Sequence, residues 1–112
     1  MMQCLQPSIR FIQDALGKNQ YRLTRHATVF RIKRRITLAQ MTEALSNGEI
    51  IEKYPDAKPY PACLVLGWLV SGDPLHIVCS RGETEPQLRI VTIYEPDDNR
   101  WEDDYKTRKV KR

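Results

Sequence analysis

The chain has two histidines, His26 and His76, which are its clearest candidates for proton transfer. An imidazole titrates near neutral pH and can act as a general base or a general acid. His26 falls in the first turn of a predicted helix, whose dipole disfavours the charged ring, so a neutral His26 able to accept a proton is expected. The alternative is that each histidine is a surface residue or a hydrogen-bonded structural residue.

A strongly basic stretch surrounds His26. Between residues 22 and 35 there are six cations and no acid, namely Arg22, Arg25, Arg31, Lys33, Arg34 and Arg35. Arginine suits bidentate binding of phosphate, and Arg34 follows His26 by eight residues, so both can project along one side of a helix. Repulsion among these cations favours a polyanionic partner over an ordinary solvated face, and nucleic-acid contact is the prediction.

Tyr94 and Trp101 flank an acidic stretch near the end of the chain. Aromatic rings beside a basic face can stack on bases, whereas packing in the core or at a sheet edge is the expectation for Trp101. The sequence has no phosphate-binding glycine loop, no G-x-S-x-G elbow and no H-E-x-x-H motif. Cys4, Cys63 and Cys79 have no metal-binding spacing, so we expect reduced thiols, a cytoplasmic protein, and no metal or other cofactor.

The elements that must position these side chains can be predicted from periodicity and capping residues. Three helices are expected, over residues 9–16, over residues 25–34, and from the capping-box residue Thr37 to Asn47. Strands are expected over residues 49–53, 63–70, 75–80 and 87–95. Residues 21–23 are either a brief strand or an extended segment that leads into the second helix. Together they predict an α+β fold, in which three N-terminal helices pack on a three- to four-stranded antiparallel sheet.

The length of 112 residues suits a single domain over residues 1–112. The net charge is +4, and basic ends surround an acidic middle, with a basic tail over residues 106–112. This distribution can hold a polyanion on one face, or it can reflect ordinary solvation. No apolar stretch reaches the length of a membrane span or suits a secretory signal, so neither a membrane nor export is expected.

Three blocks of sequence, in order, resemble a family of small prokaryotic proteins catalogued as a domain of unknown function (4258). The resemblance covers a family-like core over about residues 21–109. The first block holds residues 23–27, Arg34, 36–37 and 43–51, the second holds residues 74–78, and the third holds residues 90–97 and Trp101. His26, Arg34, His76 and Tyr94 match the family's polar pattern, whereas Arg35 stands where a glycine is usual.

The resemblance implies a relation to RelE-like and BrnT-like toxins, with a RelE-like RNase architecture. It implies a metal-independent RNA endonuclease of a type II toxin–antitoxin pair, restrained by a cognate antitoxin that is often a small zinc-finger protein. One histidine would take a proton from a ribose 2′-OH and the other would protonate the leaving 5′-oxygen. Arg34 would stabilise charge on the phosphorane-like transition state, and Tyr94 would orient a phosphate or stack on a base.

This catalytic hypothesis requires His26, His76 and Arg34 to converge on one open concavity. The alternative is a non-catalytic module that binds RNA or a protein partner through the basic face. No small-molecule ligand is expected in either case.

Overall fold

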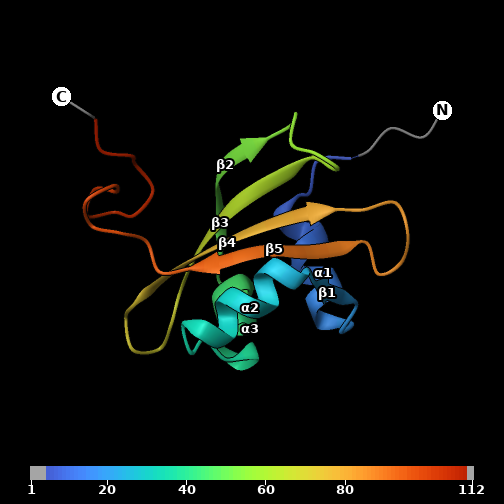
Figure 1. Cartoon of the computed structure of the whole chain (residues 1–112), viewed down its shortest axis with the longest axis horizontal. Coiled ribbons are helices and arrows are strands. Elements are labelled where there is room, and N and C mark those ends of the chain that lie inside the picture. Colours follow the sequence, from blue (N-terminus) through green and yellow to red (C-terminus); the bar gives the residue numbers. More distant parts are fainter. Residues whose placement is uncertain (1–4, 111–112) are drawn as a thin grey trace.

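Five strands and three helices make up the structure, a computed structural model that describes residues 5–110 (Figure 1). Cys4 and the last two residues of the predicted basic tail lie outside the described residues. The elements in chain order are α1 (Ile9–Gly17), β1 (Tyr21–Leu23), α2 (Arg25–Lys33), α3 (Leu38–Ser46), β2 (Glu49–Tyr54), β3 (Ala62–Trp68), β4 (Pro74–Arg81) and β5 (Leu88–Tyr94).

Each helix begins at a hydroxyl side chain that caps it, as the sequence predicted. The Thr24 hydroxyl accepts a hydrogen bond from the Ala27 amide at 3.1 Å, and Thr37 and Gln40 form the predicted capping box. These bonds satisfy amide groups that have no partner inside the helix. The cap at Thr24 fixes where α2 begins, and it therefore places His26 in the first turn.

The strands form one mixed sheet in the order β1-β5-β4-β3-β2. The pairs from β2 to β5 are antiparallel, whereas β1 is parallel to β5, with Tyr21 opposite Leu88 and Leu23 opposite Ile90. The predicted layout, with three N-terminal helices on a three- to four-stranded antiparallel sheet of RelE-like type, is therefore wrong. A strand of three residues is too short to show alternation, and its partner is remote in sequence, so periodicity could not reveal the pairing.

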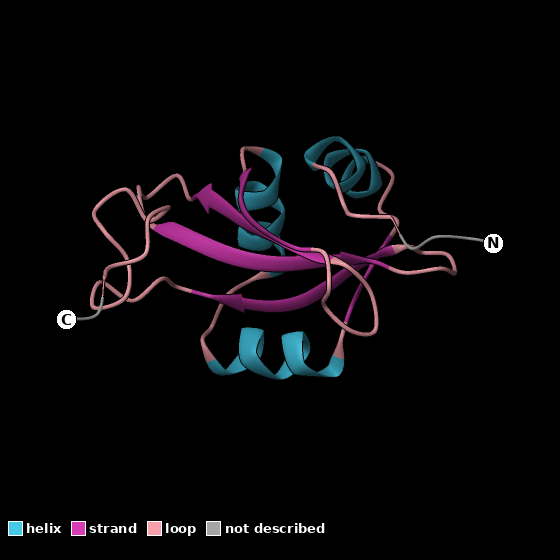
Figure 2. Cartoon of the chain, turned by 90° about the horizontal axis from the view of Figure 1, so that it is seen from above, coloured by secondary structure: helices cyan, strands magenta, loops and turns pink. Residues whose placement is uncertain are grey.

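The helices lie on two sides of the sheet. α1 and α3 contact each other, whereas α2 contacts chiefly β5, and Figure 2 shows two helices together on one side and the third apart from them on the other. α2 runs along the part of the outer edge of β5 that β1 leaves free. At the opposite edge of the sheet, β2 has a register shift between Ile50 and Glu52.

The main core lies between the sheet and the helices α1 and α3. Its fully buried side chains include Ile12, Met41, Leu45, Val65, Ile77 and Ile93. Cys63 and Cys79, which belong to this core, face each other on β3 and β4 as free thiols. None of the helices within residues 5–110 is long and apolar enough to cross a membrane.

The segment that follows β5, residues 96–110, is here called the C-terminal segment. Figure 1 shows it folding back beside the sheet at the end where β5 finishes. His76 alternates along β4 with the core residues Leu75 and Ile77, so it points to the face opposite α1 and α3. Trp101 from the C-terminal segment covers it there, with ring centroids 4.6 Å apart, and Trp101 is itself only 3% exposed.

Candidate functional site

His26 and Phe30 of α2 and Arg34, the residue that caps its C-terminal end, form one row along the helix, here called the α2 row. The His26 and Phe30 ring centroids are 4.3 Å apart, and the guanidinium carbon of Arg34 lies 4.4 Å from the Phe30 centroid. The spacing of four residues places successive members one turn apart on the same side. His26 and Arg34 are exposed while Phe30 is half-buried, so the ring supports an imidazole and a guanidinium that both reach solvent.

Hydrogen bonds at both ends of α2 attach the helix to the edge of β5. At the start, the Thr24 amide donates to the Ile90 carbonyl at 2.9 Å and the Thr24 hydroxyl donates to the Val91 carbonyl at 3.0 Å. At the other end, Arg34 Nη1 donates to the Ile93 carbonyl at 3.4 Å, a long bond. The α2 row is therefore presented on a helix whose position is set by the sheet.

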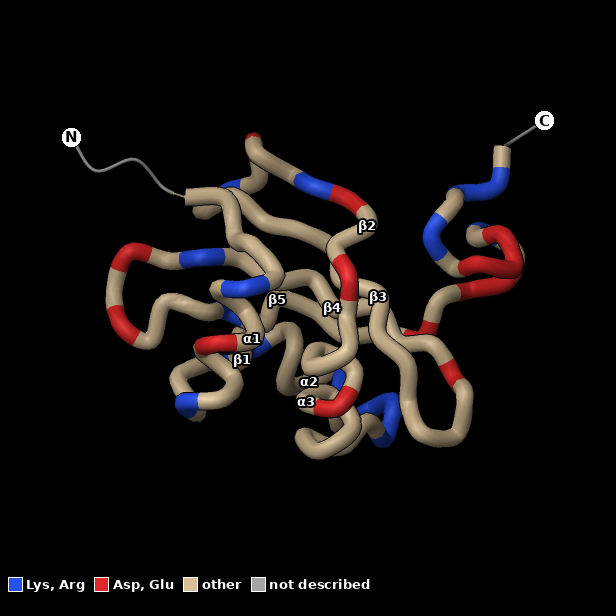
Figure 3. Tube along the Cα trace, turned by 180° about the vertical axis from the view of Figure 1, so that it is seen from behind, with Lys and Arg blue, Asp and Glu red and all other residues tan. Residues whose placement is uncertain are grey.

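The other cations predicted to bind RNA divide into exposed residues and one that turns inward. Arg22, Arg25, Lys33 and Arg35 are exposed, and Arg22 Nη2 donates to the Glu85 carbonyl at 3.2 Å. Figure 3 shows the cations of the α2–α3 turn as one blue stretch in the lower part of the molecule. Arg25 and Lys33 thus lie on α2, Arg35 lies in the turn that follows it, and Arg22 lies on β1 just before it.

Arg31 does not belong to that exposed set. It is half-buried, and its Nη1 donates to the Ile36 carbonyl at 3.0 Å across the turn between α2 and α3. Arg35 in the same turn has a φ of 58°, in the left-handed region that glycine adopts with least strain. The glycine that is usual at this position in the resembling family would adopt this φ with less strain than Arg35 does.

His76 is fully buried, and both of its ring nitrogens have partners. Nε2 lies 2.8 Å from the Tyr105 carbonyl oxygen and Nδ1 lies 3.2 Å from the Tyr94 hydroxyl. Because a carbonyl only accepts, Nε2 carries the hydrogen and Nδ1 accepts from Tyr94. Burial lowers the pKa of His76 and raises the pKa of Tyr94, so the pair is neutral near pH 7.

A polar cluster continues from His76 toward β2. Arg108 of the C-terminal segment binds the Glu52 carboxylate through Nε at 2.7 Å and Nη2 at 2.9 Å, and the Tyr54 hydroxyl donates to the same carboxylate at 2.5 Å. The hydrogen bonds from Arg108 lower the pKa of Glu52, while burial and the Glu52 carboxylate raise the pKa of Tyr54 to about 12. The charge of Glu52 also acts on His76.

The structure therefore brings His26 together with Arg34, and His76 together with Tyr94, in two separate groups. The predicted convergence of both imidazoles and a guanidinium on an open concavity is not found, because His76 is enclosed. Alternation along β4 indicated which face His76 occupies, but it could not show that the C-terminal segment returns to cover that face.

Sequence reasoning missed Phe30, Glu52, Tyr105 and Arg108. Phe30 was available from the sequence, because it stands four residues from both His26 and Arg34. The other three interact through the folded C-terminal segment, across a separation of 56 residues in the case of Glu52 and Arg108. No local pattern indicates such contacts.

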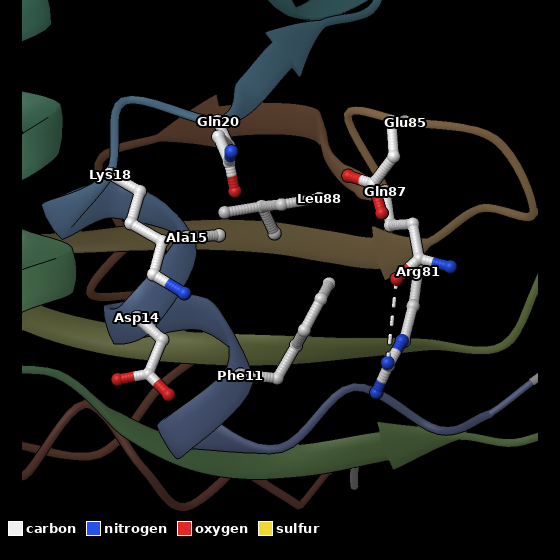
Figure 4. A pocket seen from close by; sticks show the side chains of 9 residues that line it. All are labelled: Phe11, Asp14, Ala15, Lys18, Gln20, Arg81, Glu85, Gln87 and Leu88. Atoms are coloured by element: carbon white, nitrogen blue, oxygen red, sulfur yellow. Dashed lines mark hydrogen bonds between the residues drawn. The ribbon is translucent and has the colours of Figure 1, made fainter.

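A pocket of about 210 Å³ lies between α1 and the loop joining β4 to β5, away from the predicted site residues (Figure 4). The Arg81 guanidinium carbon stands 4.2 Å from the Phe11 ring centroid and Nη2 donates to Gln87 Oε1 at 3.4 Å. The lining also includes Asp14, Lys18 and Glu85. Opposite charges are balanced here, so the pocket does not select a phosphate group.

A metal site would need several His, Cys, Asp or Glu side chains close together. Within residues 5–110, no group of three or more such residues lies close enough together to hold an ion.

Comparison with family models gives one match, to a domain of unknown function (DUF4258), over residues 23–95. The chain belongs to the DUF4258 family. The match begins at the end of β1 and ends just after β5, so the DUF4258 region contains the α2 row and the His76–Tyr94 pair. The resemblance to this family seen in the sequence is confirmed, whereas α1 and the C-terminal segment lie outside the matched residues.

Searches of curated proteins and of solved structures found no significant match. The matched family carries no description of an activity. The expected relation of this DUF4258 protein to RelE-like and BrnT-like toxins therefore stays a prediction.

Acidification is expected to destabilise the protein below about pH 6.5, the ordinary pKa of histidine. Because burial lowers the pKa of His76 in the folded state, the unfolded chain takes up this proton first as the pH falls. The free energy of unfolding should decrease between about pH 6.5 and 5, by at most about 1.4 kcal/mol per pH unit. Urea titrations at several pH values measure this slope, and His76→Gln should remove it.

His26→Gln is the matched control for this pH experiment, because His26 is exposed and its replacement changes no buried group. Its slope should equal that of the unmodified protein. An unchanged slope in His76→Gln would show that another group takes up the proton.

Proposed function

We propose that this DUF4258 protein is a toxin-like, metal-independent RNA endonuclease that meets its substrate at the α2 row. One observation carries the proposal: an exposed imidazole and an exposed guanidinium pack on the same aromatic ring of α2. They do so within a stretch of six cations and no acid over residues 22–35. Such a surface attracts a polyanion and offers both proton transfer and charge stabilisation.

In this proposal His26 takes the proton from a ribose 2′-OH. The 2′-oxygen then forms a bond to phosphorus while the bond from phosphorus to the 5′-oxygen breaks, which leaves a 2′,3′-cyclic phosphate. Arg34 binds the phosphate and stabilises the additional charge of the transition state. His76 is enclosed, so in this scheme water gives the proton to the leaving 5′-oxygen.

Phe30 acts as a positioning residue in this scheme. The Phe30 ring contacts both His26 and Arg34 and so sets the separation between base and cation. The Tyr94 hydroxyl is bonded to His76, and its side chain is half-buried. Tyr94 therefore orients the enclosed His76, and its stacking on a base stays a prediction.

The proposal includes a cognate antitoxin and a place of action in the cytoplasm, where RNA is available and thiols such as those of Cys63 and Cys79 stay reduced. The outward side of α2 supports a protein partner. Val29 and Ile32 are 52% and 62% exposed there, beside the exposed cation Lys33. An antitoxin segment with apolar and acidic side chains fits this surface.

RNA cleavage in the presence of EDTA tests the proposal. The purified protein, incubated with a structureless RNA oligonucleotide, should release fragments that end in 2′,3′-cyclic phosphate, and EDTA should not slow the reaction. Mass spectrometry of the fragments identifies these ends. Absence of cleavage, or cleavage that EDTA abolishes, would contradict a metal-independent endonuclease.

A non-catalytic RNA-binding module is the second candidate function, and the burial of His76 favours it. With one of the two histidines enclosed, the structure offers a single imidazole to a substrate. Such a module would bind RNA without cutting it, and its affinity would fall with salt by a logarithmic slope of about 0.7 per neutralised phosphate. Binding measured over a salt series, with no product in the cleavage assay, would identify this function.

A further inference from the structure

Part of the C-terminal segment, residues 103–109 (here called the arm), has its own local structure. The Asp104 carboxylate accepts hydrogen bonds from the Lys106 amide at 2.9 Å and from the Thr107 amide at 3.0 Å. The Glu102 amide donates to the Thr107 carbonyl at 2.8 Å, which closes the turn. The arm therefore keeps its shape through bonds within the C-terminal segment, independently of the sheet.

Two ion pairs join the arm to β2. Lys106 pairs with Glu49 at 2.8 Å, and both side chains are about half exposed, at 47% and 51%. Arg108 pairs with Glu52, and its side chain is 57% exposed. The Lys106–Glu49 pair is of the exposed kind that contributes little to stability and is screened by salt. Arg108 makes two hydrogen bonds to Glu52, whose side chain is 22% exposed, so the Arg108–Glu52 pair is the stronger of the two that hold the arm.

Trp101, by contrast, anchors the C-terminal segment before the arm begins. It is 3% exposed and packs on His76 at a right angle. Arg108 of the arm forms a β-bridge with Trp101, and its guanidinium carbon lies 4.6 Å from the centroid of the Trp101 ring. To move while Trp101 stays in place, the arm must release Arg108 from Trp101 as well as from Glu52.

The backbone carbonyl oxygen of Tyr105, which belongs to the arm, covers the His76 ring. The Tyr105 carbonyl accepts the hydrogen of His76 Nε2 at 2.8 Å, and the Tyr105 ring rests edge-on against Trp68, 6.0 Å between centroids. With the arm displaced, Nε2 of His76 would face solvent beside the Glu52 carboxylate, which would have lost Arg108 as its partner.

The residues beneath the arm belong to the DUF4258 region, whereas the arm does not. His76, Tyr94 and Glu52 all fall within residues 23–95, and the arm begins eight residues after that range ends. The residues matched to the family thus include His76, Tyr94 and Glu52 but not the arm that covers them.

We propose that the arm is a removable cover over a second proton-transfer site, formed by His76, Glu52 and Tyr94, and that an RNA backbone opens it. RNA phosphates would replace Glu49 and Glu52 as partners of Lys106 and Arg108. The uncovered His76 ring takes up a proton from solvent and is stabilised in its charged form by Glu52. It then gives this proton to the 5′-oxygen of a phosphodiester as the bond from that oxygen to phosphorus breaks. In the same step the 2′-oxygen, whose proton passes to water, forms its bond to phosphorus. The choice of RNA as the opening ligand rests on the proposed function, whereas the existence of a removable cover does not.

Chemical modification of His76 in the full-length protein tests the cover. Diethyl pyrocarbonate modifies accessible imidazoles, and mass spectrometry distinguishes His76 from His26. Arg108→Gln should raise the initial rate of His76 modification about fivefold, as expected for the loss of an exposed ion pair. Lys109→Gln is the matched control, since it removes an equally exposed cation of the arm for which the structure shows no acidic partner, and it should leave the rate unchanged.

The same samples show whether the change is local. Cys63 and Cys79 are fully buried in the main core, so their labelling by a thiol reagent reports global unfolding and should not differ between the variants. An unchanged His76 rate in Arg108→Gln, or a rise matched by both thiols, would overturn the cover.

A structureless RNA oligonucleotide added to the unmodified protein should raise the His76 rate in the same way. If Arg108→Gln raises the rate but RNA does not, RNA is not the opening ligand and that part of the proposal is wrong. If RNA raises the rate and no RNA is cleaved, the cover stands while the proposed endonuclease fails.

Discussion

Replacing His26 with glutamine should slow RNA cleavage by about two to four orders of magnitude, the usual contribution of a general base. The expected effect falls on the rate and not on RNA affinity, because the variant keeps Arg34 and the surrounding cations. Initial rates and RNA binding by His26→Gln, both measured in EDTA, separate the two quantities. The variant should unfold at the same urea concentration as the unmodified protein, because His26 is exposed.

Val29→Gln is the matched control for this experiment. Val29 lies on the same helix and is 52% exposed, and the structure gives it no contact with the α2 row. Its cleavage rate should be close to that of the unmodified protein. If His26→Gln cleaves as fast as Val29→Gln, His26 is not the base and the α2 row is a binding surface only.

Gly67→Ala should cause a large loss of stability, because α3 lies directly against β3 at this glycine. An added Cβ would stand 1.9 Å from the Ala44 carbonyl oxygen and 2.4 Å from its carbonyl carbon. These are backbone atoms that cannot rotate away, so the helix and the strand would have to separate. We expect a decrease of more than about 3 kcal/mol in the free energy of unfolding, the upper end for overpacked cores, measured by urea titration.

Gly17→Ala is the control for Gly67→Ala. Nothing lies within 4 Å of the position that a Cβ at Gly17 would take, and Gly17 is the last residue of α1. The free energy of unfolding should change by less than about 1 kcal/mol. Equal stability of the two variants would mean that α3 does not pack on β3 in this way.

Local features of the fold could be predicted from the sequence, because they depend on neighbouring residues. The capping box at Thr37 fixes the start of α3 through two bonds within four residues. The eight-residue spacing of His26 and Arg34 similarly placed both on one side of α2. The strands from β2 to β5 were also located within a few residues, since alternation and turn residues define them.

Long-range features could not be predicted in the same way. Arg31 was counted with the RNA-binding cations, yet it turns inward to the Ile36 carbonyl, and composition gives no sign of that direction. The burial of His76 depends on Trp101 and Tyr105, which return from the end of the chain. Periodicity assigns a side chain to a face of a sheet, but what covers that face depends on tertiary contacts.

The two edges of the sheet have different consequences for self-association. At the β5 edge, β1 and then α2 occupy the hydrogen-bonding positions that another strand would need. At the β2 edge, Lys106 and Arg108 pair with Glu49 and Glu52. The irregular register and the charged residues Glu49, Glu52 and Lys53 make this edge a poor template for a further strand. At the β5 edge, a strand of another molecule would find its hydrogen-bonding positions already taken. At the β2 edge, it would meet charged side chains and an irregular backbone. Both features protect the protein against aggregation through strand addition.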